Sequence, residues 1–103
     1  MYGSVAVAIV ALVTFHDELR ARLRETWPVG VPVLTEAALA IGAYLREERD
    51  LGRVASSADV DTLAATLIGA GHLLYADRTG APPEPEAVSR MVTTVLAGAT
   101  PAP

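Results

Sequence analysis

The sequence contains no cysteine, lysine, asparagine or glutamine, and its aromatic residues are one tryptophan, three tyrosines and one phenylalanine. The lack of cysteine excludes disulfides, thiolate nucleophiles and cysteine-based metal sites. All 8 basic residues are therefore arginine. This bias is typical of a GC-rich genome, so we expect a bacterial source.

Positive charge is also scarce. The formal net charge is −4 at pH 7, whereas a nucleic-acid-binding surface carries a basic patch or stripe. No basic helix–turn–helix is visible, so we do not expect the chain itself to bind DNA.

No apolar run is long enough to span a membrane. The longest, from Val5 to Phe15, is well short of the ~20 residues that a transmembrane helix needs. The preceding residues 1–4 lack the positive charge of a secretory signal peptide. We therefore expect a buried helix here and no membrane association.

What the chain does have is apolar content and helical spacing. Hydrophobic residues make up 51% of its 103 residues, enough for one modest core. The pattern predicts a single all-α domain over residues 1–103. We expect an antiparallel bundle of about four helices, dimerising through the last two.

The first predicted helix runs from Tyr2 or Val5 to Thr26 and ends before Pro28. Asp17 and Glu18 are expected to point outward with most of the charged residues. The predicted apolar face repeats every three or four residues: Val5, Ile9, Leu12, His16, Leu19 and Leu23.

The second helix is expected from about Val33 to Leu51, with Gly52 as its left-handed C-terminal cap. Its predicted apolar stripe is Leu34, Ala37, Ala38, Ile41 and Leu45.

The third helix is expected from about Val60 to Asp77. Asp59 is the preferred N-cap, although Ser57 is an alternative. Its predicted shared face is Val60, Leu63, Leu67, Ala70 and Leu74.

The fourth helix is expected from about Glu84 to Ala97, with Pro85 in its first turn. Its predicted stripe is Val88, Met91, Val92 and Val95.

Neither histidine has the partner that a helical metal site requires. His16 and His72 lack a His, Asp or Glu four residues later. We therefore predict no metal, no cofactor and no catalytic residue, and we do not expect an enzyme. His16 is interpreted as a hydrogen-bonded core histidine or as a polar group in a pocket.

Aromatic residues near the junction of the first two helices suggest a small-molecule pocket, although ordinary packing explains them as well. An apolar effector is the ligand that such a pocket would accept. The predicted effector-pocket residues are Leu12, Phe15, His16, Leu19, Trp27 and Tyr44.

Gly69 and Gly71 are unusual inside a helix, because each costs about 1 kcal/mol relative to alanine. Small residues let another helix approach closely. Core packing and a subunit interface are both consistent with them. The predicted dimer-interface residues are Leu63, Leu67, Ala70, Gly71, Leu74, Val88, Met91, Val92 and Val95.

Five short segments between residues 47 and 98 resemble the regulatory domain of TetR-family transcription regulators. They are Glu47–Arg53, Asp59–Ala65, Leu67–His72, Glu86–Val92 and Val95–Gly98. The resemblance covers about residues 40 to 98 and consists of helix ends and small residues rather than a catalytic motif.

The resemblance implies a cytoplasmic repressor that forms homodimers through its last two helices and binds a small molecule. In this family DNA is bound by an N-terminal helix–turn–helix, which is absent here. We therefore expect a regulatory fragment that contacts DNA only through a domain missing from this chain. The alternatives are a stand-alone dimeric helical interaction module and a small all-α enzyme.

Overall fold

The structure, a computed structural model, describes residues 2–26, 33–76 and 83–101. These residues form α1 (Tyr2–Thr26), α2 (Val33–Asp50), α3 (Val60–Ala76), α4 (Pro85–Leu96) and the short 3-10 helix η1 (Ala97–Ala99). The described ranges contain no strand, which confirms the all-α prediction. Within the same ranges, no helix has both the length and the apolar character needed to cross a membrane.

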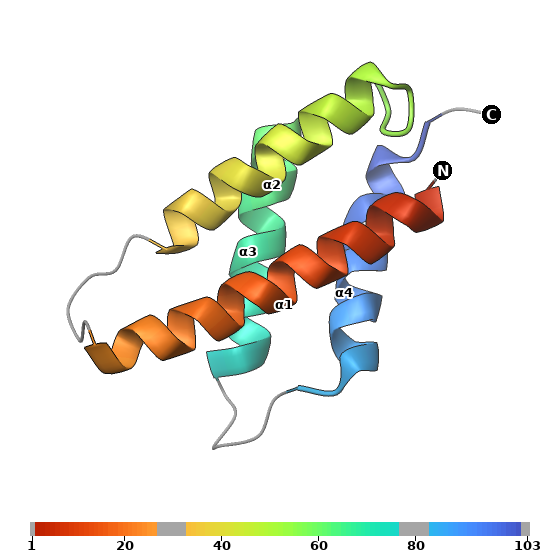
Figure 1. Ribbon diagram of the computed structural model, residues 1–103. Helices are drawn as coiled ribbons and strands as arrows, with labels where there is room; N and C mark the ends of the chain where they lie inside the picture. The colour runs from red at the N-terminus through yellow and green to blue at the C-terminus, as the bar shows by residue number, and fades with distance from the viewer. Residues whose placement is uncertain (1, 27–32, 77–82, 102–103) are drawn as a thin grey trace.

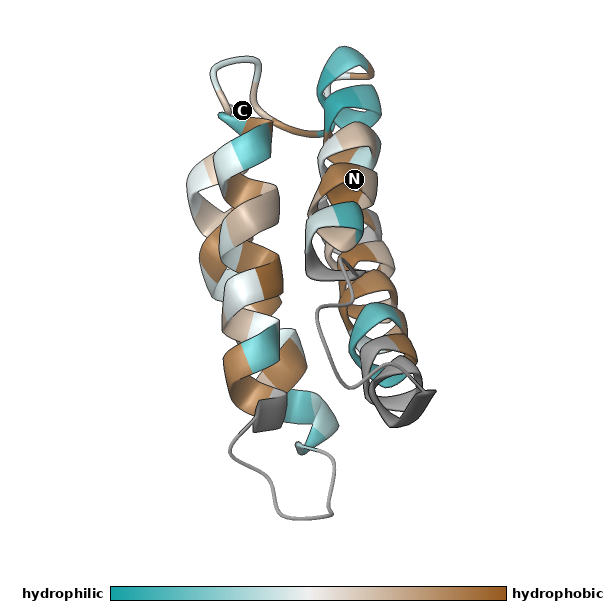
Figure 2. Cartoon of the chain, turned by 90° about the vertical axis from the view of Figure 1, so that its left-hand side faces the viewer, coloured by the Kyte–Doolittle hydropathy of each residue, from teal (hydrophilic) through white to brown (hydrophobic). Residues whose placement is uncertain are grey.

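The helices form two layers of two. In Figure 1, α1 and α2 lie side by side and antiparallel, and the antiparallel pair of α3 and α4 crosses behind them. Figure 2 shows the two layers edge-on, and hydrophobic (brown) residues appear in both of them. Helix α1 contacts each of the other three helices, whereas α2 and α4 are diagonal and do not touch within the described residues.

The core lies between the two layers and receives residues from all four helices. These side chains are aliphatic, and their burial provides most of the stability of such a bundle. The largest fully buried ones are Val5, Ile9, Val13, Ile41, Leu45, Leu67, Val92 and Leu96.

The buried face of α1 differs from the predicted one. Burial follows a strict four-residue step from Val5 through Ile9 and Val13 to Asp17, while Leu12 and His16 are half-buried on the flank of this face. The prediction that Asp17 points outward was wrong, because its residue is only 4% exposed. The first half of this helix is apolar on every side, so its sequence pattern did not fix its rotation.

The end of α2 is built as predicted. Gly52 has φ of +79°, the left-handed conformation that glycine adopts most readily. Its N–H donates to the Arg49 carbonyl (3.0 Å), and the Arg53 N–H donates to the Glu48 carbonyl (2.9 Å). This is the Schellman arrangement, which satisfies carbonyls that the helix leaves free.

The start of α3 confirms Asp59 as the N-cap. Its carboxylate accepts the Thr62 backbone N–H (3.1 Å) and the Thr62 hydroxyl (2.7 Å). These bonds hold the pKa of Asp59 below its ordinary value. The buried face of α3 is rotated from the predicted one, because Ala64 and Ile68 are buried whereas Leu63, Ala70 and Leu74 are half-buried.

Helix α4 begins with Pro85 and has Glu84 as its N-cap. Val88 and Val92 are buried as expected, and Leu96 joins them. After α4 the chain tightens into η1, where the Ala99 carbonyl accepts the Ala55 N–H at 2.8 Å. This backbone bond ties the loop between α2 and α3 to the segment that follows α4.

Candidate functional site

The residues predicted to line an effector pocket lie on two neighbouring helices. Leu12, His16 and Leu19 are half-buried on α1, and Tyr44 is half-buried on α2. Phe15 is 56% exposed and packs edge-on against His16, with 5.2 Å between ring centroids. Trp27 lies outside the described residues. An apolar effector pocket at this place therefore stays a prediction.

Tyr44 belongs to a polar cluster at the end of α2. It hydrogen-bonds to Glu48, one helical turn later, and the guanidinium of Arg53 binds both carboxylate oxygens of Glu48. Burial, and then the negative charge of Glu48, raise the pKa of Tyr44. The hydrogen bond from Arg53 lowers the pKa of Glu48 although burial opposes this. The cluster keeps Glu48 ionised where little water reaches it.

The residues predicted for a dimer interface fall into two groups. Leu67, Gly71, Val88 and Val92 are buried within this single chain, so they pack in its own core. The other five are half-buried at the edge of the α3–α4 layer and have surface left for a partner: Leu63, Ala70, Leu74, Met91 and Val95.

The outward face of α3 is small and uncharged beyond its first turn. Ala65, Thr66, Gly69 and Leu73 are exposed there, and Leu73 is 64% exposed. A Cβ at Gly69 would meet nothing within 4 Å. Among the described residues, Gly69 therefore has no packing partner that requires a glycine, unlike its neighbour Gly71.

Gly71 on α3 packs directly against α1. A Cβ at this position would lie 2.6 Å from Val13 Cγ1 and 3.3 Å from Asp17 Oδ2. The adjacent His72 is half-buried, and its Nδ1 atom is buried with no hydrogen-bond partner in the part of the chain that the structure describes. The glycine thus makes room for a buried carboxylate at the crossing of the two helices.

A second apolar surface runs along α1. Val7, Ala11 and Phe15 follow one another at four-residue steps and are all exposed; Val7 is 71% exposed. Leu39 on α2 is similarly exposed, at 69%. A row of exposed apolar side chains such as Val7, Ala11 and Phe15 is characteristic of interaction or ligand sites.

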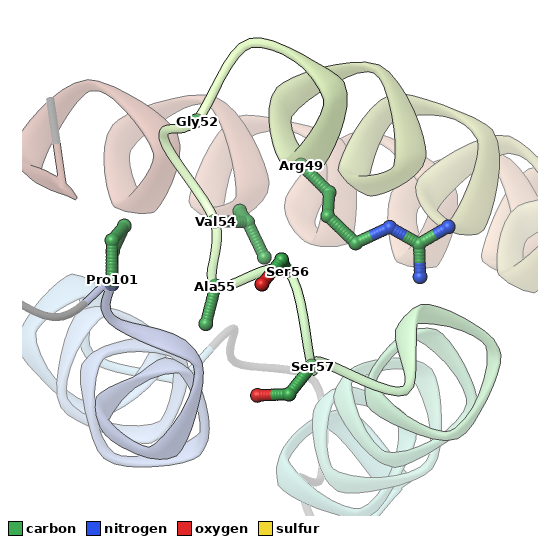
Figure 3. Close-up of a pocket in the computed structure, with 7 residues that line it drawn as sticks. All are labelled: Arg49, Gly52, Val54, Ala55, Ser56, Ser57 and Pro101. Carbon is green, nitrogen blue, oxygen red and sulfur yellow. The ribbon is translucent and has the colours of Figure 1, made fainter.

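A pocket of about 310 Å³ lies at the corner where α2 passes into α3. We call it the corner pocket. In Figure 3, Pro101 stands on one side and Arg49 on the opposite side, with the loop between them. Its seven lining residues are Arg49, Gly52, Val54, Ala55, Ser56, Ser57 and Pro101.

Two local structures shape this pocket. The Schellman turn at Gly52 reverses the chain after α2, and a second turn is closed by the Ala58 N–H donating to the Ala55 carbonyl (3.0 Å). Arg49 extends over the start of α3, where its Nη1 donates to the Ala58 carbonyl at 3.0 Å. This hydrogen bond therefore fixes the Arg49 side chain to the end of the loop.

The corner pocket was not predicted from the sequence. Gly52 and Asp59 marked the two ends of its loop, but Pro101 reaches it only through the packing of α4 and η1. Its lining combines one cation, Arg49, and the hydroxyls of Ser56 and Ser57 with apolar walls. Within the described residues, no group of three or more His, Asp or Glu side chains is placed to hold a metal.

Comparison of the chain with known protein families, with curated proteins and with solved structures finds no match.

Proposed function

We propose that this chain is the ligand-binding and dimerisation domain of a TetR-like bacterial transcriptional regulator. The observation that carries the proposal is the outward face of α3. Gly69 is exposed there with open space around it, although glycine weakens a helix. A second helix packed against this face would account for the glycine, since small residues allow helix backbones to approach closely.

The antiparallel pairing of α3 and α4 supports the same proposal. Both helices occupy one layer, and their outer surface lies away from α1 and α2. Two such layers from two chains would form a four-helix interface. The half-buried Leu63, Leu74, Met91 and Val95 would lose their remaining exposure there, which would favour association.

In this proposal, a small apolar effector binds near the aromatic residues of α1 and α2. DNA binding belongs to a helix–turn–helix outside these 103 residues. Effector binding would favour one arrangement of the two chains over another. Two DNA-binding domains would then no longer match half-sites one helical turn apart.

The exposed stripe on α1 favours a second candidate. Val7, Ala11 and Phe15 present an apolar surface that a partner helix could cover. The chain would then be a stand-alone helical interaction module that dimerises but binds no small molecule. A small all-α enzyme is the least supported alternative.

The dimer is tested with Ala70→Glu, which places a charge at the edge of the proposed interface. We expect the unaltered chain to have the mass of a dimer in size-exclusion chromatography with light scattering. The variant should elute as a monomer, because burying an unpaired carboxylate opposes association. Ala43→Glu is the matched control, since Ala43 is exposed on α2 and its variant should remain dimeric.

Ala70 is half-buried, so its variant needs a check on folding. A second interface variant, Ala65→Glu, avoids this difficulty, because Ala65 is exposed on the same helix and its replacement leaves the core intact. We expect this variant to be a monomer as well. Circular dichroism confirms that each variant is helical. A dimer mass retained by both folded variants, or a monomeric unaltered chain, would refute the proposed interface.

A further inference from the structure

We propose that the corner pocket binds a small oxyanion, a carboxylate or a phosphate carried on a short apolar body. Its volume of about 310 Å³ lies at the small end of the range typical of ligand sites. None of its residues belongs to the predicted effector pocket. It would therefore be a second ligand site, independent of the proposed regulatory function.

Arg49 supplies the charge that selects an anion. It is the one charged residue among the seven that line the pocket. Its Nη1 is held by the Ala58 carbonyl, and its remaining N–H groups have no partner among the described residues. A guanidinium that is tethered at one corner loses less freedom on binding, and it matches the geometry of carboxylate and phosphate oxygens.

Further donors lie on the loop. The hydroxyls of Ser56 and Ser57 have no hydrogen-bond partner within the described residues, and both residues are exposed. Figure 3 shows these side chains between Arg49 and Pro101. A bound oxyanion accepts hydrogen bonds from several donors at once, so a pocket lined by one arginine and two serine hydroxyls suits it.

Three carboxylates on the segments that flank the pocket are engaged elsewhere. Glu48 is bound by Arg53, and Asp59 accepts from Thr62. Asp61 binds Arg46, with 2.9 Å between Oδ1 and Nη2. None of the three lines the pocket. Arg49 therefore supplies the one charge in the lining of the pocket, and that charge is positive.

The rest of the pocket is apolar. Val54 is buried beneath the loop, and Pro101 forms the wall that follows α4. These residues would contact a short hydrocarbon group on the ligand. A ligand bound here would contact the loop between α2 and α3 and also the segment after α4. The hydrogen bond from the Ala55 N–H to the Ala99 carbonyl joins these two segments.

The test is a titration of the isotope-labelled chain followed by amide NMR. One arm uses inorganic phosphate and the other uses butyrate, so the tighter of the two identifies the ligand class. We expect saturable shifts at the amides of Gly52, Ser56 and Ser57. Arg49→Gln should weaken binding by about tenfold or more, since it removes a charge-assisted contact.

Arg90→Gln is the matched control, because Arg90 is exposed on α4 and does not line the pocket. It makes the same change in net charge, and we expect it to leave the affinity within about twofold. Equal weakening by both variants would show general charge attraction and overturn the proposal. So would the absence of saturable shifts at the three amides with either probe.

Arg49→Gln also removes the contact to Ala58, so its effect on the loop is checked with a second variant. Ser56→Ala combined with Ser57→Ala keeps Arg49 and changes only exposed hydroxyls. We expect this double variant to bind severalfold more weakly with an unchanged thermal unfolding midpoint. Unchanged affinity in the double variant, together with unfolding of Arg49→Gln, would overturn the proposed site.

Discussion

Glu48 is an ionised side chain in a position where water has little access. Its side chain is 10% exposed, while that of its partner Arg53 is 44% exposed. The two residues stand at opposite ends of the Schellman bond from the Arg53 N–H to the Glu48 carbonyl. An apolar pair commonly occupies these two positions; here an ion pair closes the turn.

We predict that Glu48→Gln destabilises the fold by about 1–2 kcal/mol at neutral pH, because Arg53 and Tyr44 lose a charged acceptor. Urea unfolding followed by circular dichroism measures this free energy. Glu47→Gln is the matched control, because Glu47 is the adjacent residue and is exposed. Its effect should be within about 0.5 kcal/mol.

The effect of Glu48→Gln should depend on pH in one direction. The pKa of Glu48 is lowered from an ordinary value of 4.5 in the folded state. Its stabilising contribution is therefore complete above that value and is lost as pH falls through the lower folded pKa. The difference between the chain and its variant should shrink in acid. A difference that stays constant down to the acid unfolding limit would contradict the assignment.

At the scale of single residues, the sequence was sufficient where the cause is local. Gly52 and Asp59 were predictable because a C-terminal cap and an N-cap depend on the few residues around them. Asp17 was not, because its burial depends on a glycine more than fifty residues later. No local pattern distinguishes a buried aspartate on α1 from the exposed Glu18 beside it.

The two glycines of α3 have different roles within one helix. Gly69 faces open space, whereas Gly71 faces Val13 and Asp17 on α1. Val13 is fully buried and cannot move away easily. The same substitution should therefore have opposite effects at positions two residues apart.

We predict that Gly69→Ala stabilises the chain by about 1 kcal/mol, the usual gain in a helix interior. Gly71→Ala should destabilise it by about 1–3 kcal/mol, because the added methyl group overlaps Val13. Urea unfolding at a single low protein concentration measures both. Equal stabilisation by the two variants would mean that α1 does not pack against α3 at Gly71.

Helix boundaries were predicted more accurately than helix faces. All four helices begin and end within about one or two residues of the expected positions, since Pro, Gly and capping residues act locally. The faces of α1 and α3 were rotated from the predictions. Both helices are rich in apolar residues on several sides, so the contacts with neighbouring helices decide which side is buried.

The whole molecule separates its apolar surfaces. One lies on α1, at Val7 and Phe15, and another lies on α3, at Leu73. They belong to different layers of the structure. A regulator that both dimerises and binds an effector needs one surface for each task. An interaction module needs a surface for its partner but no ligand pocket.

We predict that an apolar probe, anilinonaphthalene sulfonate, binds the folded chain and raises its thermal unfolding midpoint. The single tryptophan, Trp27, is a predicted pocket residue, so its emission should be quenched by energy transfer to the probe. Phe15→Ala should weaken binding severalfold. Leu39→Ala is the matched control on α2 and should leave it unchanged.

Equal loss in both variants would indicate general adhesion to apolar surface rather than a pocket. No binding by the folded chain would favour the interaction module. Neither outcome bears on the corner pocket, which shares no residue with this surface.

The arrangement of the layers could not be predicted from the sequence. Periodicity indicated helices that bury one side, but it did not show that α1 touches all three others while α2 and α4 stay apart. The corner pocket depends on this arrangement, since it brings Pro101 to the end of α2. Pairings between distant segments follow from the complete packing and have no short sequence signal.

The hydrogen bond between Ala55 and Ala99 has a mechanical consequence. It anchors the last turn after α4 to the loop that follows α2, although those two helices have no contact in the ranges that the structure describes. A displacement of α4 along its own axis would break this bond, whereas a swing about its anchored end would preserve it. The position of the segment after α4 is therefore fixed relative to the end of α2 by a backbone hydrogen bond rather than by contact between the two helices.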